Sequence, residues 1–300
     1  MYNLIHALSF DIEDWFHIAG IPEVERRGNW HEYPTIVEDK TDLILDILDE
    51  YDVKATFFVL GWIAEKYPDL IKKIVDRGHE IGSHGYWHYR VNTISRQMFK
   101  TYLERSITVL EELSGQKVKG YRAPSFSIMP GYEWAFEVMK EVGLRYDASL
   151  FPTQRGHGGY AIDQRPQLLP SSISKTNFIE LPMSVMNFGK IKIPFSGGGY
   201  LRFWHEKVLQ HGFNKLEKEG MPGVVYLHPR DFAPDCPRVK MSQFRRFKCY
   251  FNLHTTHRKL EMLLENYKFG TCEEVLKQWF EVVDLEELIK NKEKYLEGVV

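Results

Sequence analysis

The sequence lacks the features of secreted and membrane-spanning proteins. No apolar run is long enough to cross a bilayer, and the opening residues MYNLIHALSFDIEDWF contain no basic segment of the kind that begins a signal peptide. Only three cysteines occur in 300 residues and none belongs to a CxxC pair, a pattern typical of reduced thiols in a reducing compartment. We therefore expect a cytoplasmic location and no integral membrane segment.

The sequence also lacks an excess of either charge. Its 39 Lys and Arg residues are balanced by 41 Asp and Glu residues, which gives a net charge of −2. The chain as a whole has no basic field that would attract nucleic acid or an anionic membrane surface, so a neutral polymer is a better candidate partner. Its composition, with 43% hydrophobic and 14% aromatic residues, is sufficient for a large core.

Strand-like and helix-like segments alternate along most of the chain. Apolar runs typical of buried strands lie at 4–10, 55–60, 79–83, 118–122, 178–182 and 223–227. Amphipathic segments with helical spacing lie at 35–51, 63–77, 96–113, 133–142 and 206–219. This alternation predicts an α/β fold with a parallel sheet and outer helices, either an open doubly wound sheet or a barrel.

No internal repeat or convincing linker divides the sequence, so we expect a single domain over residues 1–300. Residues 147–177 are irregular and rich in Gly, Pro, Gln and Ser, which predicts a long connection facing the substrate. From about residue 233 to residue 300 the pattern is mainly helical. We expect this last part to form a C-terminal extension packed on the domain.

Chemically capable side chains follow four of the predicted strands. The carboxyl ends of parallel strands meet at one face of an α/β fold, so residues far apart in the sequence can share a pocket there. The residues in question are Asp11, Glu13 and Asp14 after the first strand, His84 and His88 after the third, Arg122 after the fourth, and His228 after the last.

His84 and His88 are four residues apart, so a helical turn would direct both imidazoles to one side, within reach of one metal ion. Gly85 occupies the position of the glutamate in HExxH, which removes the base of a zincin protease. A lone HxxxH pair is more often two structural histidines than a metal site. Two imidazoles and a carboxylate would suit zinc first, with cobalt, nickel, manganese or iron also compatible.

The sequence does not decide whether Glu13 or Asp14 is the carboxylate ligand of the metal. Strand parity places Glu13 on the same side as Asp11, whereas Asp14 needs a turn to reach it. Whichever of the two does not bind the metal is expected to cap the following segment.

Asp11, beside a metal-activated water, would serve as a general base, and Arg122 would hold it ionised. His228 is suited to protonating a leaving amine near neutral pH, and Asp147 would orient Arg122 or His228. Each of these residues alone is about as well explained by a buried ion pair or a satisfied structural histidine. Among the aromatic residues near the motifs, Trp15 and Tyr200 are candidates for stacking on a sugar ring.

Taken together, these motifs resemble the NodB-homology polysaccharide deacetylases, also called carbohydrate esterase family four. That family has an acidic motif after the first strand, then HxxxH, RxP, an Asp-containing motif and a late Leu-His motif. The matching stretches here are SFDIED at 9–14, SHGYWH at 83–88, YRAPSF at 121–126, YDASLF at 146–151 and VYLHP at 225–229.

The resemblance implies a distorted (β/α) barrel, usually of seven strands, with a divalent metal bound by one carboxylate and two histidines. It implies Asp11 as base, His228 as acid, Arg122 as partner of the base and Asp147 as a supporting residue. Two departures are visible. The acidic motif DIED spreads out the usual adjacent aspartates, and Ser125 replaces a common Tyr, although its backbone N–H can still stabilise an oxyanion.

The remaining sequence, with ELPMSV at 180–185, PFSGGGYLRFW at 194–204 and the segment 244–276, resembles the exopolysaccharide-locus subgroup of that family. This resemblance implies hydrolysis of N-acetyl groups on an amino-sugar polysaccharide, an oligosaccharide or a lipid-linked precursor, with release of acetate. Two alternatives stay open: an amidohydrolase that opens a small cyclic imide or ureide, and a catalytically silent carbohydrate-binding barrel. The sequence leaves the oligomeric state unknown.

Overall fold

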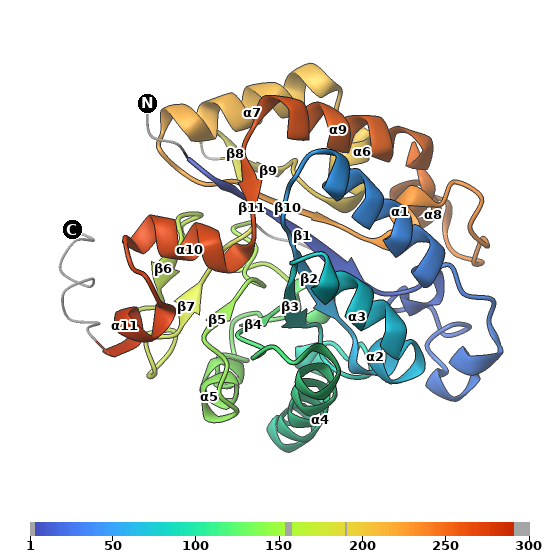
Figure 1. Cartoon of the computed structure of the whole chain (residues 1–300), viewed down its shortest axis with the longest axis horizontal. Coiled ribbons are helices and arrows are strands. Elements are labelled where there is room, and N and C mark those ends of the chain that lie inside the picture. The colour runs from blue at the N-terminus through green and yellow to red at the C-terminus, as the bar shows by residue number, and fades with distance from the viewer. Residues whose placement is uncertain (1–3, 154–157, 190, 291–300) are drawn as a thin grey trace.

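A curled, mainly parallel sheet forms the centre of the computed structural model, which describes residues 4–153, 158–189 and 191–290 (Figure 1). Seven parallel strands follow the order β10-β1-β2-β3-β4-β5-β7, and β6 pairs antiparallel at the edge. The predicted distorted α/β barrel of seven strands is confirmed in the form of a half-barrel. The strands are β1 His6–Ile12, β2 Thr56–Val59, β3 Glu80–Ser83, β4 Gly120–Tyr121, β5 Tyr146–Asp147, β6 Gln167–Leu168, β7 Ile179–Glu180 and β10 Val224–Leu227.

Strand β1 shows how the sheet separates two cores. Leu8, Phe10 and Ile12 belong to the larger core, which lies between the strands and the outer helices. The alternate residues face the concave side, where Ala7 belongs to a second core and Asp11 points toward Arg122. Because β1 is buried on both faces, it is an apolar run and not a strictly alternating one, as a parallel strand requires.

Outer helices cover the convex face of the sheet (Figure 1). Their apolar stripes were recognised from the sequence, but the predicted helix 63–77 is two helices, because Tyr67 leaves the helical region before Pro68. The helices of this half are α1 Val37–Glu50, α2 Gly61–Lys66, α3 Pro68–Asp76, α4 Arg96–Ser114 and α5 Trp134–Glu141.

The region after β5 contains elements that the sequence patterns did not indicate. A two-stranded antiparallel sheet joins β8 Val185–Phe188 to β9 Ile191–Pro194, and the short helix α6 Gly198–Phe203 follows. Then comes the predicted helix α7 Glu206–Lys218. Short elements such as these depend on tertiary pairing more than on local pattern.

The C-terminal part is mainly helical and reaches both ends of the half-barrel. It contains α8 Gln243–Tyr250, α9 Thr256–Asn266, α10 Cys272–Phe280 and α11 Leu285–Lys290, together with β11 Phe269–Gly270, which pairs with the first residues of β1. Helix α10 packs into the concave core at the amino end of the strands, where the Cys272 backbone N–H donates to Thr56 Oγ1. The division at about residue 233 stays a prediction, and the predicted helical stretch beyond 290 lies outside the described residues.

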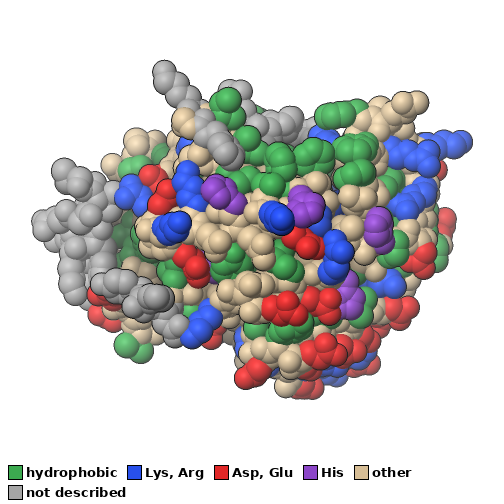
Figure 2. Space-filling model, turned by 90° about the horizontal axis from the view of Figure 1, so that it is seen from above, with side chains coloured by type: hydrophobic (Ala, Val, Ile, Leu, Met, Phe, Trp, Pro, Cys, Tyr) green, Lys and Arg blue, Asp and Glu red, His purple; other side chains and the backbone are tan. Residues whose placement is uncertain are grey.

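The described residues also contain short 3₁₀ helices, which are η1 Trp15–His17, η2 Arg27–Glu32, η3 Val91–Thr93, η4 Pro124–Phe126, η5 Pro229–Phe232 and η6 Leu253–Thr255. Of the helices described, none combines the length and apolarity needed to cross a membrane. On the face seen from above, acidic and basic side chains are interspersed, while hydrophobic side chains gather toward one edge (Figure 2).

Candidate metal and catalytic site

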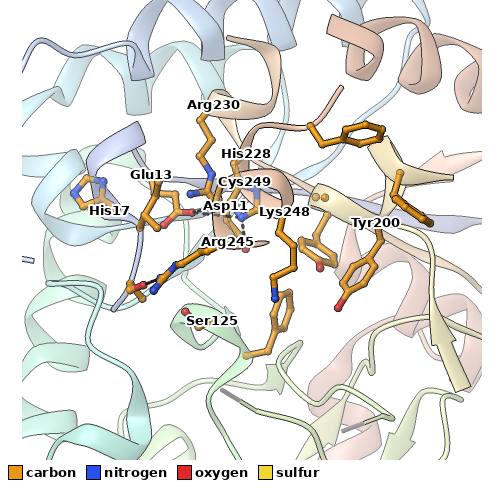
Figure 3. Close-up of a pocket in the computed structure, with 18 of the residues that line it drawn as sticks. Asp11, Glu13, His17, Ser125, Tyr200, His228, Arg230, Arg245, Lys248 and Cys249 are labelled. Atoms are coloured by element: carbon orange, nitrogen blue, oxygen red, sulfur yellow. Dashed lines mark hydrogen bonds and ion pairs between the residues drawn. The ribbon is translucent and has the colours of Figure 1, made fainter. Parts of the chain in front are cut away.

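A cavity of about 650 Å3 lies at the carboxyl end of the parallel strands. One side carries the predicted chemical groups, and the other is built from α6 and α8 (Figure 3). The predicted residues that line it are Asp11, Glu13, His84, His88, Ser125, Tyr200 and His228. The sequence-based expectation that the ends of the strands converge therefore holds for Asp11, Glu13, His84, His88 and His228. Ser125 and Tyr200 line the cavity from η4 and α6.

Glu13, His84 and His88 form the candidate metal site. Each is buried, and one ligand atom from each lies within 4.8 Å of the other two. His88 Nε2 is 2.8 Å from Glu13 Oε2. Burial by itself would raise the pKa of Glu13, but the charge and hydrogen bond of His88 outweigh it and hold that pKa well below its usual value. The carboxylate is therefore ionised, as a metal ligand must be.

His84 presents the correct nitrogen to this site. Its Nδ1 lies 2.8 Å from the backbone carbonyl of Arg122, an acceptor only, so Nδ1 carries the proton and Nε2 keeps its lone pair. Burial lowers the pKa of His84 to about 4, which keeps the ring neutral. An ionised carboxylate with two imidazoles fits a divalent cation such as zinc, and this donor set is the basis of the assignment.

The two histidines do not share a helical turn, so that part of the sequence argument was wrong. Residues 84–90 contain bends and no helix. The chain reverses because Gly85 and His88 both lie in the left-handed region, with φ of 77° and 54°. A non-glycine residue in that region is strained, and such strain is found where a side chain must be held in one direction.

Asp11 and Arg122 form a buried ion pair beside the candidate metal site. Arg122 Nη1 lies 2.9 Å from Asp11 Oδ1 and also donates to Ser9 Oγ, while Nε donates to the Ala148 carbonyl. Arg122 is fully buried and its guanidinium packs 4.3 Å from the centre of the Phe58 ring. The guanidinium, fixed at several points, holds the Asp11 carboxylate in one orientation, as a general base requires.

His228 approaches the same carboxylates from β10. Its Nε2 is 3.4 Å from Glu13 Oε1 and 3.8 Å from Asp11 Oδ2, and its Nδ1 is 2.8 Å from Asp231 Oδ2. Burial opposes protonation, but the charge and hydrogen bond of Asp231 outweigh it and raise the pKa of His228. Arg202 Nη2 lies 3.4 Å from Asp231 Oδ1. The Asp231 carboxylate thus favours the protonated form of His228 and orients the ring, with Nε2 directed toward Asp11 and Glu13.

Asp147 does not line the cavity, and it does not orient His228. Its carboxylate accepts from the Ser149 hydroxyl and backbone N–H, and it lies beside the buried Glu180. Burial raises the pKa of both acids, and the charge of Asp147 adds to the effect on Glu180. Glu180 Oε2 has no donor facing it, so it is satisfied when it carries a proton toward Asp147. The pair behaves as one charge near Arg122.

Two further sequence candidates lie away from the cavity. Asp14, the competing metal carboxylate, caps η1 by accepting from the Trp15 backbone N–H and also accepts from the Thr35 hydroxyl and the Val37 backbone N–H. These bonds occupy its carboxylate, so Glu13 and not Asp14 joins the histidines. The indole of Trp15 donates to Pro34 O and packs on Phe16, so it is a core residue and not a sugar platform.

Sequence reasoning missed three residues that line or support the cavity. Asp231 follows His228 by three residues, and this His-x-x-Asp spacing after a strand was the available signal. Arg230 Nη2 lies 3.8 Å from Glu13 Oε1. His17 accepts the Asp14 backbone N–H at Nδ1, so its neutral ring carries the proton on Nε2 and is a donor, not a metal ligand. No sequence pattern distinguished His17 from a core histidine.

Comparison with known families gives two adjacent matches. Residues 30–146 match the polysaccharide deacetylase family, and residues 148–277 match a domain of unknown function, DUF3473. The first match contains His84, His88 and Arg122, and the second contains His228 and the walls built from α6 and α8. Asp11 and Glu13 precede both matched segments.

Curated relatives align over about a third of the chain. A peptidoglycan-N-acetylglucosamine deacetylase of Bacillus cereus is 37% identical over 98 residues, which are 32% of this chain and 36% of the relative. A peptidoglycan deacetylase of Helicobacter pylori is 32% identical over 109 residues, 36% of each protein. The chain therefore matches only about a third of the length of these relatives.

Among solved structures, a Mycobacterium smegmatis protein named as a polysaccharide deacetylase superposes with a TM-score of 0.60 at 19% identity. The match covers 97% of this chain and 91% of that protein. At this identity the likeness concerns the fold, and it extends over nearly the whole chain, whereas the curated relatives match about a third of it.

Proposed function

Because the chain contains a polysaccharide deacetylase domain followed by a DUF3473 region, we propose that it is a metal-dependent N-deacetylase of an amino-sugar polysaccharide or its lipid-linked precursor. Hydrolysis breaks the acetamide C–N bond, releases acetate and leaves a free amine on the sugar. The proposed setting is exopolysaccharide or cell-wall polysaccharide metabolism. The relatives that act on peptidoglycan support an N-acetylated glycan as the substrate class.

One observation carries this proposal: an acid, a base and a metal-ligating cluster meet at the same end of one cavity. His228 Nε2 lies within 3.8 Å of both Asp11 and Glu13, which belong to the base and the metal site respectively. Hydrolysis of an amide needs these three functions within a few ångströms of the scissile bond.

A divalent cation held by Glu13, His84 and His88, zinc being our first choice, would supply a Lewis acid for the carbonyl and lower the pKa of water. Asp11 removes the proton from the attacking water, and Arg122 holds its carboxylate in position for that transfer. The backbone N–H of Ser125, on the cavity wall, donates to the developing oxyanion.

His228 then gives the proton on Nε2 to the departing nitrogen. A protonated amine leaves more readily than an amide anion, so this transfer is needed for C–N cleavage. Asp231 and Arg202 hold the ring with Nδ1 turned away from the substrate. Tyr200, on the opposite wall, is positioned to contact a sugar ring (Figure 3).

The test is acetate release from N-acetylglucosamine oligomers by the purified chain, measured after metal removal and again after titration with zinc, cobalt, nickel, manganese or iron. We expect one acetate and one free amine per event and full dependence on added metal. A cyclic imide and a hydantoin serve as alternative substrates. Ring opening without acetate release would reject the deacetylase, and stoichiometric metal binding without turnover of any substrate would favour a silent carbohydrate-binding protein.

A further inference from the structure

Helix α8 presents phenylalanines to solvent at the mouth of the cavity. None of its eight residues is buried, and Phe244 and Phe247 are 72% and 44% exposed. Phe203 of the neighbouring helix α6 is 51% exposed and lies 6.5 Å from Phe247, centre to centre. Exposed apolar side chains that are contiguous in this way mark an interaction surface more often than a stable solvent-facing wall.

Polar contacts and the packing of Cys249 and Tyr250 against the core hold α8 in place. Arg202 donates to the backbone carbonyls of Lys248, Cys249 and Phe251 at the carboxyl end of the helix. Arg245 donates to the carbonyls of Ala19 and Gly20, which connects the helix to the loop after η1. The outward rings are therefore not needed to anchor the helix, and their exposure calls for another explanation.

The segment around α8 is strongly basic although the whole chain is close to neutral. From residue 236 to residue 260 there is no Asp or Glu, and seven residues are Lys or Arg. Arg246 and Lys248 are exposed on α8 itself, and the Lys248 ammonium lies 4.8 Å from the centre of the Phe244 ring. Phe244, Phe247 and Lys248 thus lie together at the mouth of the cavity, and Arg246 adds a further exposed cation on the same helix.

We propose that this surface, made of Phe203, Phe244, Arg246, Phe247 and Lys248 and here called the α8 platform, docks on an anionic phospholipid bilayer. A short amphipathic helix with Phe and basic residues binds at the level of the headgroups, where rings enter the acyl boundary and cations meet phosphates. Helix α8 carries both the phenylalanines and the cations that such binding requires. The contacts of Arg202 and Arg245 hold the helix in place, so that it can present both kinds of side chain together.

A bilayer fits the α8 platform better than a second copy of the chain or a sugar. Two facing platforms would bring Arg246 and Lys248 against like charges, which opposes association. Phe lacks the hydroxyl or indole N–H with which Tyr and Trp satisfy polar groups at a sugar or protein interface. Three of these rings also line the cavity, so docking would turn the mouth of the cavity toward the headgroup layer.

Vesicle sedimentation with the full chain tests the proposal, using either pure phosphatidylcholine or equal parts of phosphatidylcholine and phosphatidylglycerol. We expect binding to the anionic vesicles, weakened by added salt, and little binding to neutral ones. Arg246→Gln should weaken binding about fivefold, since one cation near an anionic surface contributes that order of affinity. Phe244→Ser with Phe247→Ser should weaken it at least about tenfold.

Matched controls come from the rest of the surface. Val283→Ser removes a hydrophobic residue that is 87% exposed, and Lys72→Gln removes an exposed cation from α3, and both should bind as the unmodified chain does. Circular dichroism and thermal melting establish that each variant is folded. The assay contains no substrate, so its result is independent of the deacetylase proposal.

Two results would overturn the α8 platform. One is absence of sedimentation with anionic vesicles at low salt. The other is sedimentation of the Arg246→Gln variant and of the Phe244→Ser, Phe247→Ser double variant with anionic vesicles to the same extent as the controls. If the unmodified chain did not bind vesicles but formed concentration-dependent dimers, and if those variants abolished the dimers, the surface would be assigned to contact with a second copy. That result would also reject the bilayer.

Discussion

The two halves of the chain contribute different chemistry to one cavity. The first half supplies Asp11, the proposed base, and the candidate ligands Glu13, His84 and His88, which follow strands β1 and β3. The half matched by DUF3473 supplies the acid candidate His228 and the aromatic and basic wall. Under the proposed mechanism, water activation belongs to the first half, whereas leaving-group protonation and substrate contact belong to the second.

The largest effect should come from the metal ligands of the first half. His84→Ala removes a neutral imidazole whose lone pair faces the site, so both metal binding and acetate release should fall to the level of the chelator-treated protein. Metal content after dialysis and acetate release measure the two quantities. Gln116→Ala, outside the cavity, is the control. Full activity in a His84→Ala protein without metal would exclude the metal site.

Asp11→Asn should separate catalysis from metal binding. The amide keeps the shape of the side chain but accepts no proton, so kcat should fall by about 10²–10⁴ while the bound metal is retained. Acetate release and calorimetric metal titration measure the two effects. Loss of metal in proportion to activity would instead make Asp11 a ligand, and unimpaired acetate release would contradict its role as base.

Asp231→Asn should change the pH dependence of the step in which His228 protonates the leaving nitrogen. Without the carboxylate charge the pKa of His228 falls, so the alkaline limb of the pH–rate profile should move to lower pH. The expected loss in kcat is up to about 10²-fold and is larger at pH 8 than at pH 6. His228→Gln should abolish that limb. An unchanged limb in the Asp231→Asn protein would mean that another group is the acid.

The smallest effect should be at the aromatic wall. Tyr200→Ala removes a ring that lines the cavity opposite the catalytic groups, so KM should rise about threefold to tenfold with kcat little changed. Tyr200→Phe keeps the ring and is the matched control. If both variants lowered kcat and left KM alone, Tyr200 would act in the chemical step and the division between the halves would need revision.

Local sequence patterns located the main strands and helices of both halves, apart from the break at Tyr67, but not the short elements of the second half. Buried runs such as the one that forms β1, and helices such as α4 with Ser95 as N-cap and Gly115 as C-cap, are specified by spacing and capping residues. Helix α6 and the β8–β9 hairpin are short, and their stability depends on contacts with distant segments. Arg202 illustrates this, because its partners Asp231, Lys248 and Cys249 lie 29 to 47 residues away.

In the candidate site, too, local sequence patterns did not decide the role of every single residue. Parity along β1 favoured Glu13 over Asp14, but it did not decide between them. The choice followed from Thr35 and Val37, which occupy the Asp14 carboxylate from a segment about twenty residues away. Likewise, a helical spacing suggested that His84 and His88 converge, and they do converge, through positive φ at Gly85 and His88.

The sequence by itself determined the main parallel strands, that their polar ends carry carboxylates, imidazoles and a guanidinium, and that these ends lie on one face, because parallel strands share a direction. Only the tertiary structure decided which carboxylate joins the histidines, which residue orients His228, and which aromatic rings remain exposed. Those outcomes depend on hydrogen bonds and packing between residues far apart in the chain, which no local pattern encodes.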